Sequence, residues 1–480
     1  MGASRAIYRD VTLPQQTVDR SPTKQPLVLH VAEGYGGREW DNDEDGDVLT
    51  FAVSLRPMRL LTAFAFALAL AGCSSAQLLQ RPPVARPAPM AVSARAVWIG
   101  TATLFDSLGS PERLRAGLER SAAAGFTDVV VELKPYGGDV AYPSRVSTRL
   151  TTSGGFTPDP DWDVAADAVR TGRELGLRVH LALNVFAEGD HARRSGPVYG
   201  LRRTWQTAVL TPDGTVQTST RLAPSDRTTD VAYTNPVRPD VRNHALALVS
   251  EVAGRYRPDG LLLDRLRFEG RTADFSPETR AAFEQWLHVP VTNWPSDILA
   301  RTGTTFTPGP LYPKWLEWRA LSLRSFVEAT RQLVRGISPT TALGVLAPAD
   351  YAAAAEAGLN WGAVAYDPQA DYPWATPMYR EKSLAAFVDV LVPELPVALP
   401  EADTLLLRTV AERVQGATRV VPSLQIRAFP TADAFEAALR ATLRTSGAVL
   451  VSDYGELARR PAYWAALARA FAVEPASAVR

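Results

Sequence analysis

The sequence has little cysteine, little histidine and no excess of charge of either sign. Cys73 is the single cysteine among 480 residues, so no disulfide can form within the chain and packing must stabilise the fold. The 51 basic and 51 acidic side chains balance, which leaves no global field to attract nucleic acid. The five histidines lack metal-ligand spacing, which makes a metal-dependent deacetylase the weaker enzyme alternative. No metal, cofactor or nucleic acid is therefore expected.

Two catalytic motifs and long apolar runs are also missing. There is no Gly-x-Ser-x-Gly elbow, and no glycine-rich phosphate loop follows a predicted strand, which removes the usual nucleotide-binding interpretation. One apolar run stands out, within Met58–Gln77, and no second run approaches a membrane span. Arg59 precedes apolar or small residues from 60 to 70, which is the layout of a secretory signal. A short buried helix is the alternative interpretation.

The end of that run resembles a bacterial lipobox. The tetrad Leu70-Ala71-Gly72-Cys73 places the only thiol at the position that is lipidated. This predicts an exported protein that is anchored to a bacterial envelope membrane through Cys73. An acidic run, Asp41–Asp47, lies where a signal should be positive, so we expect translation to start at Met58. The predicted parts are an extension that is mis-assigned or disordered (1–57), a lipoprotein signal peptide (58–72), a Pro/Ala-rich tether (73–94) and one folded domain (95–475).

The folded part alternates short aliphatic runs with amphipathic helical runs, a pattern that predicts parallel strands joined by crossover helices. With 46% apolar and 21% charged residues, the chain can bury a full core. The predicted strands are 96–100, 128–134, 178–184, 260–264, 343–347, 388–392, 420–425 and 448–453. Eight such units favour an α/β fold of the (β/α)8 TIM-barrel type.

Loop lengths support a barrel over an open doubly wound sheet, which remains the alternative. Helices join the next strand by tight turns, as at Gly125 and Gly176, whereas the strand-to-helix connections are long, notably 185–238 and 348–373. In a (β/α)8 barrel the strand-to-helix loops build the active site, so elaboration belongs there. Within the first long loop, 205–218 alternates around a turn and predicts a hairpin.

Polar residues at the carboxyl ends of strands are the main functional signal, because charge on a barrel strand is costly unless it is paired or functional. Glycoside hydrolysis needs two carboxyl groups, one as proton donor and one as nucleophile or base. Asp264 ends an apolar strand and is the predicted nucleophile, with Arg267 favouring its ionised form; a structural ion pair between the two is the alternative. Glu394 is the predicted proton donor, or else an exposed loop acid. Other candidates for the acid are Asp453, Glu132 and Glu269.

Other polar and aromatic residues at strand ends and loops are candidates for binding a saccharide. His180 lies inside an apolar strand, which favours a hydrogen-bonded barrel histidine over a metal ligand. Aromatic residues gather in the loop after the fifth strand and form either a saccharide platform or a loop pinned by its own side chains. The candidate substrate-binding residues are Lys134, Asp139, Tyr142, His180, Asn184, Trp361, Tyr366 and Trp374.

Several segments resemble the glycosyl-hydrolase-like family 10 barrels. These are Arg95–Ile99, Gly138–Ser144, Gly176–His180 with Asn184, Asn235-Pro236 with Asp240–Arg242, Asp259–Phe268 and Glu317–Arg319. The resemblance implies a (β/α)8 hydrolase of glycosidic bonds, with lipid-anchored bacterial members associated with peptidoglycan glycan. In the wider superfamily it implies that Asp264 is the nucleophile and Glu394 the acid. The chain departs from many relatives at Arg265, Ala182 and Glu394, where they have an acid, a tryptophan and a glutamine.

The sequence therefore predicts an envelope lipoprotein that hydrolyses cell-wall glycan or another extracellular polysaccharide with carboxylates at its strand ends. The alternative is a non-catalytic saccharide-binding lipoprotein on a degenerate barrel. Only the enzyme needs two carboxylates at catalytic separation.

Overall fold

The computed structural model describes residues 94–153, 155–395 and 400–472, without the side chains of 400–403. The predicted extension, the signal at 58–72, Cys73 and nearly all of the predicted tether lie outside the described residues. None of the described helices combines the length and apolar character of a membrane-spanning segment.

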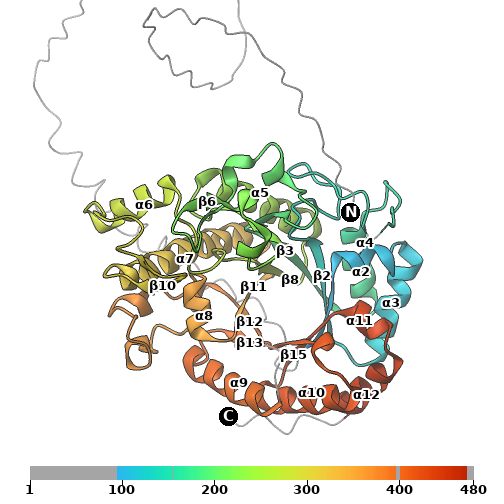
Figure 1. Ribbon diagram of the computed structural model, residues 1–480. Coiled ribbons are helices and arrows are strands. Elements are labelled where there is room, and N and C mark those ends of the chain that lie inside the picture. Colours follow the sequence, from blue (N-terminus) through green and yellow to red (C-terminus); the bar gives the residue numbers. More distant parts are fainter. Residues whose placement is uncertain (1–93, 154, 396–399, 473–480) are drawn as a thin grey trace, which may run out of the picture. The chain divides into compact units, whose positions relative to one another are not determined.

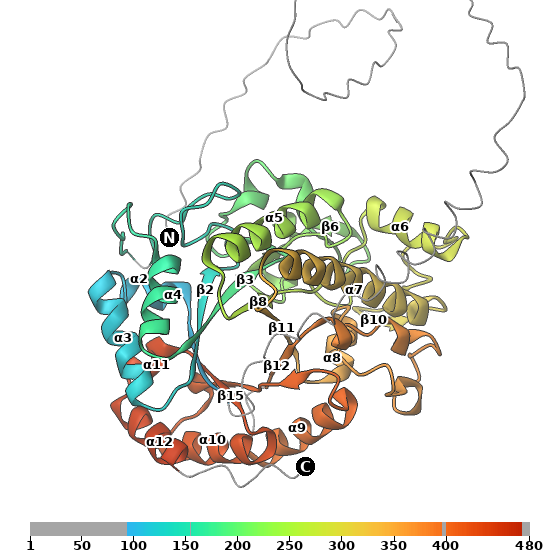
Figure 2. The same cartoon turned by 180° about the vertical axis from the view of Figure 1, so that it is seen from behind.

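Parallel strands close into a barrel with helices around it, which confirms the predicted fold (Figures 1 and 2). Pairing of β11 with β12 joins the two halves of the sheet and closes it. The barrel strands are β1 (Arg95–Ile99), β2 (Asp128–Lys134), β3 (Arg178–Asn184), β8 (Gly260–Asp264), β11 (Ala342–Pro348), β12 (Val390–Glu394), β13 (Arg419–Val420) with β14 (Ser423–Gln425), and β15 (Val449–Ser452). Together β13 and β14 occupy the seventh of eight positions.

The helices lie outside the strands in Figure 1, and several begin where the sequence supplies a start signal. For example, the Ser110 side chain accepts a hydrogen bond from the Arg113 amide, and Pro111 occupies the first turn. The helices are α2 (Thr101–Asp106), α3 (Pro111–Ala123), α4 (Val164–Glu174), α5 (Pro239–Tyr256), α6 (Pro277–Leu287), α7 (Tyr312–Ile337), α8 (Tyr351–Glu356), α9 (Pro400–Val414), α10 (Ala432–Ser446), α11 (Tyr454–Ala458) and α12 (Pro461–Ala472).

The long strand-to-helix loops carry structure of their own. The predicted hairpin is confirmed as β5 (Ala208–Leu210) and β6 (Val216–Thr218), which pair antiparallel. Two further antiparallel pairs are β4 (Ala187–Asp190) with β7 (Val231–Tyr233), and β9 (Leu299–Thr302) with β10 (Thr305–Pro308). Helix-to-strand turns are short, as between Ser446 and Val449. The elaborated loops therefore all lie at one end of the barrel, where the strands end.

Side chains alternate between two cores along each strand. One face of each strand packs against the helices, and the other fills the barrel. The interior cluster contains Ala96, Trp98, Val130, Ala182, Leu262, Leu346, Val390, Val392 and Leu450, among others. This alternation decides which side chains at the strand ends point toward the barrel axis.

Candidate active site

Asp264 and Glu394 occupy the carboxyl ends of β8 and β12 on the face that fills the barrel. Asp264 follows Leu262 by two residues, and Glu394 follows Val392 by two; both apolar residues belong to the interior cluster. Because strand side chains alternate with a period of two, both carboxyl groups project toward the barrel axis. Only β11 separates the two strands. The two predicted catalytic acids therefore share the barrel mouth.

Glu394 has the environment of a proton donor. Burial and the nearby charge of Asp264 raise the pKa of Glu394, although Arg267 and Arg265 oppose the shift. The Arg267 Nη1 atom lies 3.9 Å from Glu394 Oε2, and 33% of the Glu394 side chain remains exposed. A carboxyl group with a raised pKa that still faces solvent can hold a proton and deliver it to a substrate.

The partner of Asp264 is Arg265, not the Arg267 that we expected. The Arg265 amide donates a hydrogen bond of 2.6 Å to Asp264 Oδ1. Burial disfavours the Arg265 charge, but Asp264, Tyr233 and Glu394 together outweigh it and raise the pKa of that guanidinium. Arg267 instead lies beside Glu394 and donates from Nε to the Tyr233 hydroxyl at 3.0 Å. The family resemblance marked Arg265 only as a departure from relatives, and it gave no signal for this contact or for the backbone φ of 51° at Arg265.

Glu132 is a third carboxyl group at the mouth, fixed by its neighbours. Its Oε2 accepts hydrogen bonds from the Thr101 amide at 2.9 Å and the Thr101 hydroxyl at 3.0 Å. Its Oε1 accepts one from Asn184 Nδ2 at 3.0 Å, and Asn184 is aligned with Asp264 across β3 and β8. Burial and the charge of Asp264 raise the pKa of Glu132 against these hydrogen bonds. The charge of Asp264 therefore affects the pKa of Glu132, while hydrogen bonds from Thr101 and Asn184 fix the orientation of its side chain.

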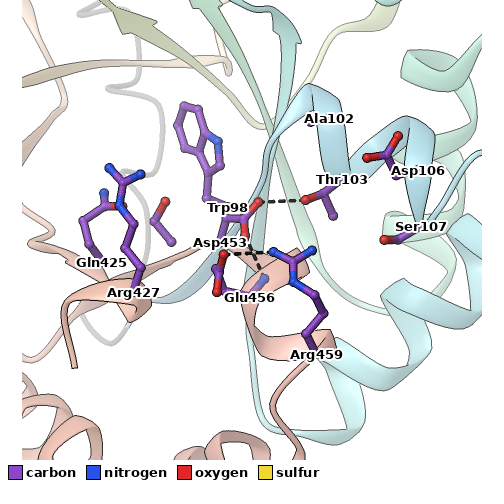
Figure 3. A pocket seen from close by; sticks show the side chains of 11 residues that line it. Trp98, Ala102, Thr103, Asp106, Ser107, Gln425, Arg427, Asp453, Glu456 and Arg459 are labelled. Carbon is purple, nitrogen blue, oxygen red and sulfur yellow. Dashed lines mark hydrogen bonds and ion pairs between the residues drawn. The ribbon is translucent and has the colours of Figure 1, made fainter. Parts of the chain in front are cut away.

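Asp453 lies at the same end of the barrel, beside a cavity of about 460 Å³ between β1, β14 and β15. Its Oδ2 accepts a hydrogen bond of 2.8 Å from the Thr103 hydroxyl, and its Oδ1 accepts one of 2.9 Å from the Glu456 amide (Figure 3). A methyl group on Gly100 would lie 3.4 Å from Asp453 Oδ2, 3.7 Å from Trp98 Nε1 and 3.8 Å from Glu132 Oε2. Gly100 thus marks the place where the cavity and the central carboxyl groups meet.

Glu269 is a further candidate acid, and its pKa is affected by Asp274 instead of Asp264. Burial raises the pKa of Glu269 to about 8, and the charge of Asp274 adds to the shift. Its Oε2 atom is buried with no hydrogen-bond partner among the described residues. Glu269 therefore stays a candidate acid, but the charge that acts on it is that of Asp274.

Lys134 is not placed to bind a substrate. Its ammonium group is fully buried and donates to the carbonyls of Asn184 and Ala187 at 2.6 and 2.7 Å. It also forms an ion pair of 3.0 Å with Glu188. This network holds the start of the loop after β3 against the end of β2. Asp139 lines a separate cavity of about 550 Å³, and burial and Glu188 raise its pKa.

His180 and Tyr142 are likewise structural, contrary to the substrate-binding prediction. His180 lies early in β3, opposite Gly260, and its Nε2 is 2.8 Å from Asp128 Oδ1. Burial disfavours the Asp128 carboxylate, but hydrogen bonds from His180 and Arg178 outweigh it and hold the pKa of Asp128 well below its usual range. Tyr142 is fully buried, and its hydroxyl donates to Glu251 at 2.9 Å.

The aromatic loop after β11 packs on itself. Trp361 is fully buried, lies edge-on to Tyr351 with ring centroids 4.9 Å apart, and donates from Nε1 to the Pro348 carbonyl. Tyr366 and Trp374, which are partly buried, pack against the same Tyr351 ring. The loop therefore matches the alternative of a segment pinned by its own aromatic side chains, and Trp361 offers no platform to a sugar.

Comparison with known proteins gives one family and one shared fold. Residues 93–383 match the family described as glycosyl hydrolase-like 10. An S-layer-related protein of Niallia circulans is 32% identical over 246 residues, which cover 49% of this chain but only 15% of that protein. The glycoside hydrolase domain of PgaB (BpsB) from Bordetella bronchiseptica is 16% identical with a TM-score of 0.54, over 78% of this chain and 98% of that domain. The latter likeness shows the fold alone.

Proposed function

The chain belongs to the glycosyl hydrolase-like 10 family, and on that premise we propose that it is a glycoside hydrolase of the bacterial envelope. Its substrate in this proposal is the glycan of the cell wall, peptidoglycan, or another extracellular polysaccharide. The observation that carries the proposal is the pair formed by Asp264 and Glu394 at the barrel mouth, where one acid raises the pKa of the other.

The two acids have the division of labour that glycosidic cleavage requires. Glu394 holds its proton through burial and the charge of Asp264, and it passes that proton to the oxygen of the leaving sugar. Asp264, whose carboxyl group accepts from the Arg265 amide, either attacks the anomeric carbon or activates a water. In both routes the negative charge of Asp264 stabilises the oxocarbenium-like transition state. Glu132 adds a third carboxyl group, held in place by Thr101 and Asn184, at the same end of the barrel.

The envelope location rests on the sequence around Cys73. The apolar run within Met58–Gln77 and the lipobox-like tetrad support export and lipid anchoring, with Cys73 as the modified residue. A barrel that is tethered to a membrane at its N-terminal side meets cell-wall glycan as its nearest polymer.

The decisive experiment measures new reducing ends after the soluble domain is incubated with purified glycan strands, with and without stem peptides. We expect wild-type protein to release them and Asp264→Asn to lose turnover by several orders of magnitude, because the nucleophilic charge is gone while the shape remains. Asp433→Asn is the matched control, since Asp433 is 96% exposed on the outer helix α10. Thermal unfolding of both variants reports on the fold.

The rival function is saccharide binding without catalysis. It predicts that wild-type protein and Asp264→Asn bind glycan strands equally and that neither releases reducing ends. Near-normal turnover in Asp264→Asn would instead show that hydrolysis uses another acid, and Glu132, Glu269 and Asp453 would be substituted next.

A further inference from the structure

The cavity beside Asp453 joins the central carboxyl groups at Trp98. Trp98 belongs to the barrel-interior cluster together with Leu262, two residues before Asp264, and it also lines the cavity. Its Nε1 and the Glu132 carboxylate lie within 4 Å of the same point, the position of a methyl group on Gly100. A ligand in the cavity would therefore lie next to a ligand at the barrel centre.

The walls of this cavity carry opposite charges. Figure 3 shows Gln425 and Arg427 on one side of Trp98, and Thr103 and Asp106 on the other. Arg427 is exposed and has no hydrogen-bond or ion-pair partner among the residues that the structure describes, so its donors are available. Asp453 supplies a carboxylate that Thr103 and the Glu456 amide hold in place.

The third carboxylate of the cavity is already neutralised. Glu456 Oε1 lies 2.9 Å from Arg459, and its Oε2 lies 3.3 Å from Arg460. The charged groups left to meet a ligand are the cation of Arg427 and the carboxylates of Asp453 and Asp106. Any ligand with a full charge would meet a like charge on one wall, whereas hydroxyl groups can accept from Arg427 and donate to a carboxylate.

We propose that this cavity is a second sugar-binding position that takes an uncharged, hydroxyl-bearing sugar ring of the same glycan chain. The proposal rests on the proposed function, because it needs a saccharide at the barrel centre. The exposed part of Trp98, 7% of the residue, meets the ring, Arg427 and Asp453 supply its polar contacts, and the volume of about 460 Å³ is in the range of small-ligand sites.

Binding measured without turnover tests the proposal. In the Asp264→Asn background, isothermal titration calorimetry with chitin oligosaccharides of increasing length gives the affinity of each. We expect a gain in affinity when the chain becomes long enough to reach the cavity. Adding Arg427→Ala should lower the affinity for the long oligosaccharides about tenfold, as expected for the loss of a hydrogen bond from a charged group. The affinity for the short oligosaccharides should not change. Arg444→Ala, an exposed arginine on α10, is the control and should change neither.

Charge on the sugar is tested with chitosan oligosaccharides and with chitin oligosaccharides oxidised to carboxylates. We expect both to gain less from added length than the uncharged chain. A larger gain for either charged series would overturn the uncharged assignment, and equal effects of Arg427→Ala and Arg444→Ala would overturn the second position itself. If no oligosaccharide binds at any length while the protein still cleaves a different glycan, only this inference fails. If none binds and no glycan is cleaved, the proposed function fails with it.

Discussion

Removing the positive charge beside Glu394 should move the alkaline limb of the pH–rate profile to higher pH. Arg267 Nη1 lies 3.9 Å from Glu394 Oε2, with 23% and 33% of the two side chains exposed. Two unit charges about 4 Å apart interact by about 1 kcal/mol in bulk water and about 4 kcal/mol near a protein surface. Partial exposure and screening favour the lower end, about 1 to 2 kcal/mol, which corresponds to about one pKa unit.

The alkaline limb moves to higher pH because Glu394 acts as the proton donor. Arg267 lowers the pKa of Glu394 against the dominant effects of burial and Asp264. In Arg267→Met that opposition is lost, so the pKa rises and the acid keeps its proton to higher pH. The alkaline limb of kcat/KM reports this group in the free enzyme, and it should shift upward by about one pH unit.

Two controls separate charge from contact. Arg267→Lys keeps the charge and should keep the limb near its wild-type position. Tyr233→Phe removes the hydroxyl that accepts from Arg267 Nε at 3.0 Å, but leaves the charge, and it should not move the limb either. An alkaline limb that stays in place in Arg267→Met, or moves to lower pH, would refute the assignment of Glu394 as the acid that titrates there.

Three other changes test the packing, a buried acid and the anchor. Gly260→Ala should destabilise the fold by about 1–3 kcal/mol in urea unfolding, because the new methyl would lie 2.3 Å from Nδ1 of the buried His180. The control is Gly254→Ala, whose methyl would lie 3.6 Å from its nearest neighbour and which should be neutral or slightly stabilising. Equal losses of stability in the two variants would contradict the clash. Burial raises the pKa of Glu269 to about 8, so the folded state loses stability as the pH rises from about 4.3 through 8. Glu269→Gln should therefore be about 1–3 kcal/mol more stable than wild type at pH 8 and nearly equal to it at pH 4. A gain of the same size at both pH values would contradict this. Cys73→Ser should leave the membrane fraction or accumulate as precursor, whereas unchanged membrane association without a mass shift at the wild-type N-terminus would rule out lipidation.

The fold could be predicted because each barrel strand has a strong local signal. The fourth strand was predicted at its observed bounds, Gly260–Asp264, since three leucines precede a single acid between turn residues. The predicted seventh strand, 420–425, is interrupted in the structure, and β13 and β14 flank Pro422, which has no amide proton for the ladder. The sixth begins two residues later than predicted and reaches Glu394. The local sequence pattern therefore predicts where each strand lies, but it predicts the first and last residues of a strand less accurately.

The site could be predicted only where position along a strand decides the environment. Asp264 and Glu394 end their strands, so the sequence places them at the mouth. His180 sits early in its strand and finds Asp128 on the neighbouring one, a pairing that depends on register. Lys134 ends its strand but is neutralised by Glu188 from the following loop. A single sequence carries no signal for these partners, because they meet only when the barrel closes.

Gly100 gives the binding surface a point at which specificity can change without a change of fold. Its backbone φ is −66°, which any residue adopts, and an added methyl would make only ordinary contacts with Asp453, Trp98 and Glu132. The position therefore tolerates a side chain for the sake of stability, yet that side chain would stand between the barrel centre and the neighbouring cavity. Substitution at this one position, in evolution or in the laboratory, can therefore shorten or lengthen the stretch of polymer that the barrel binds.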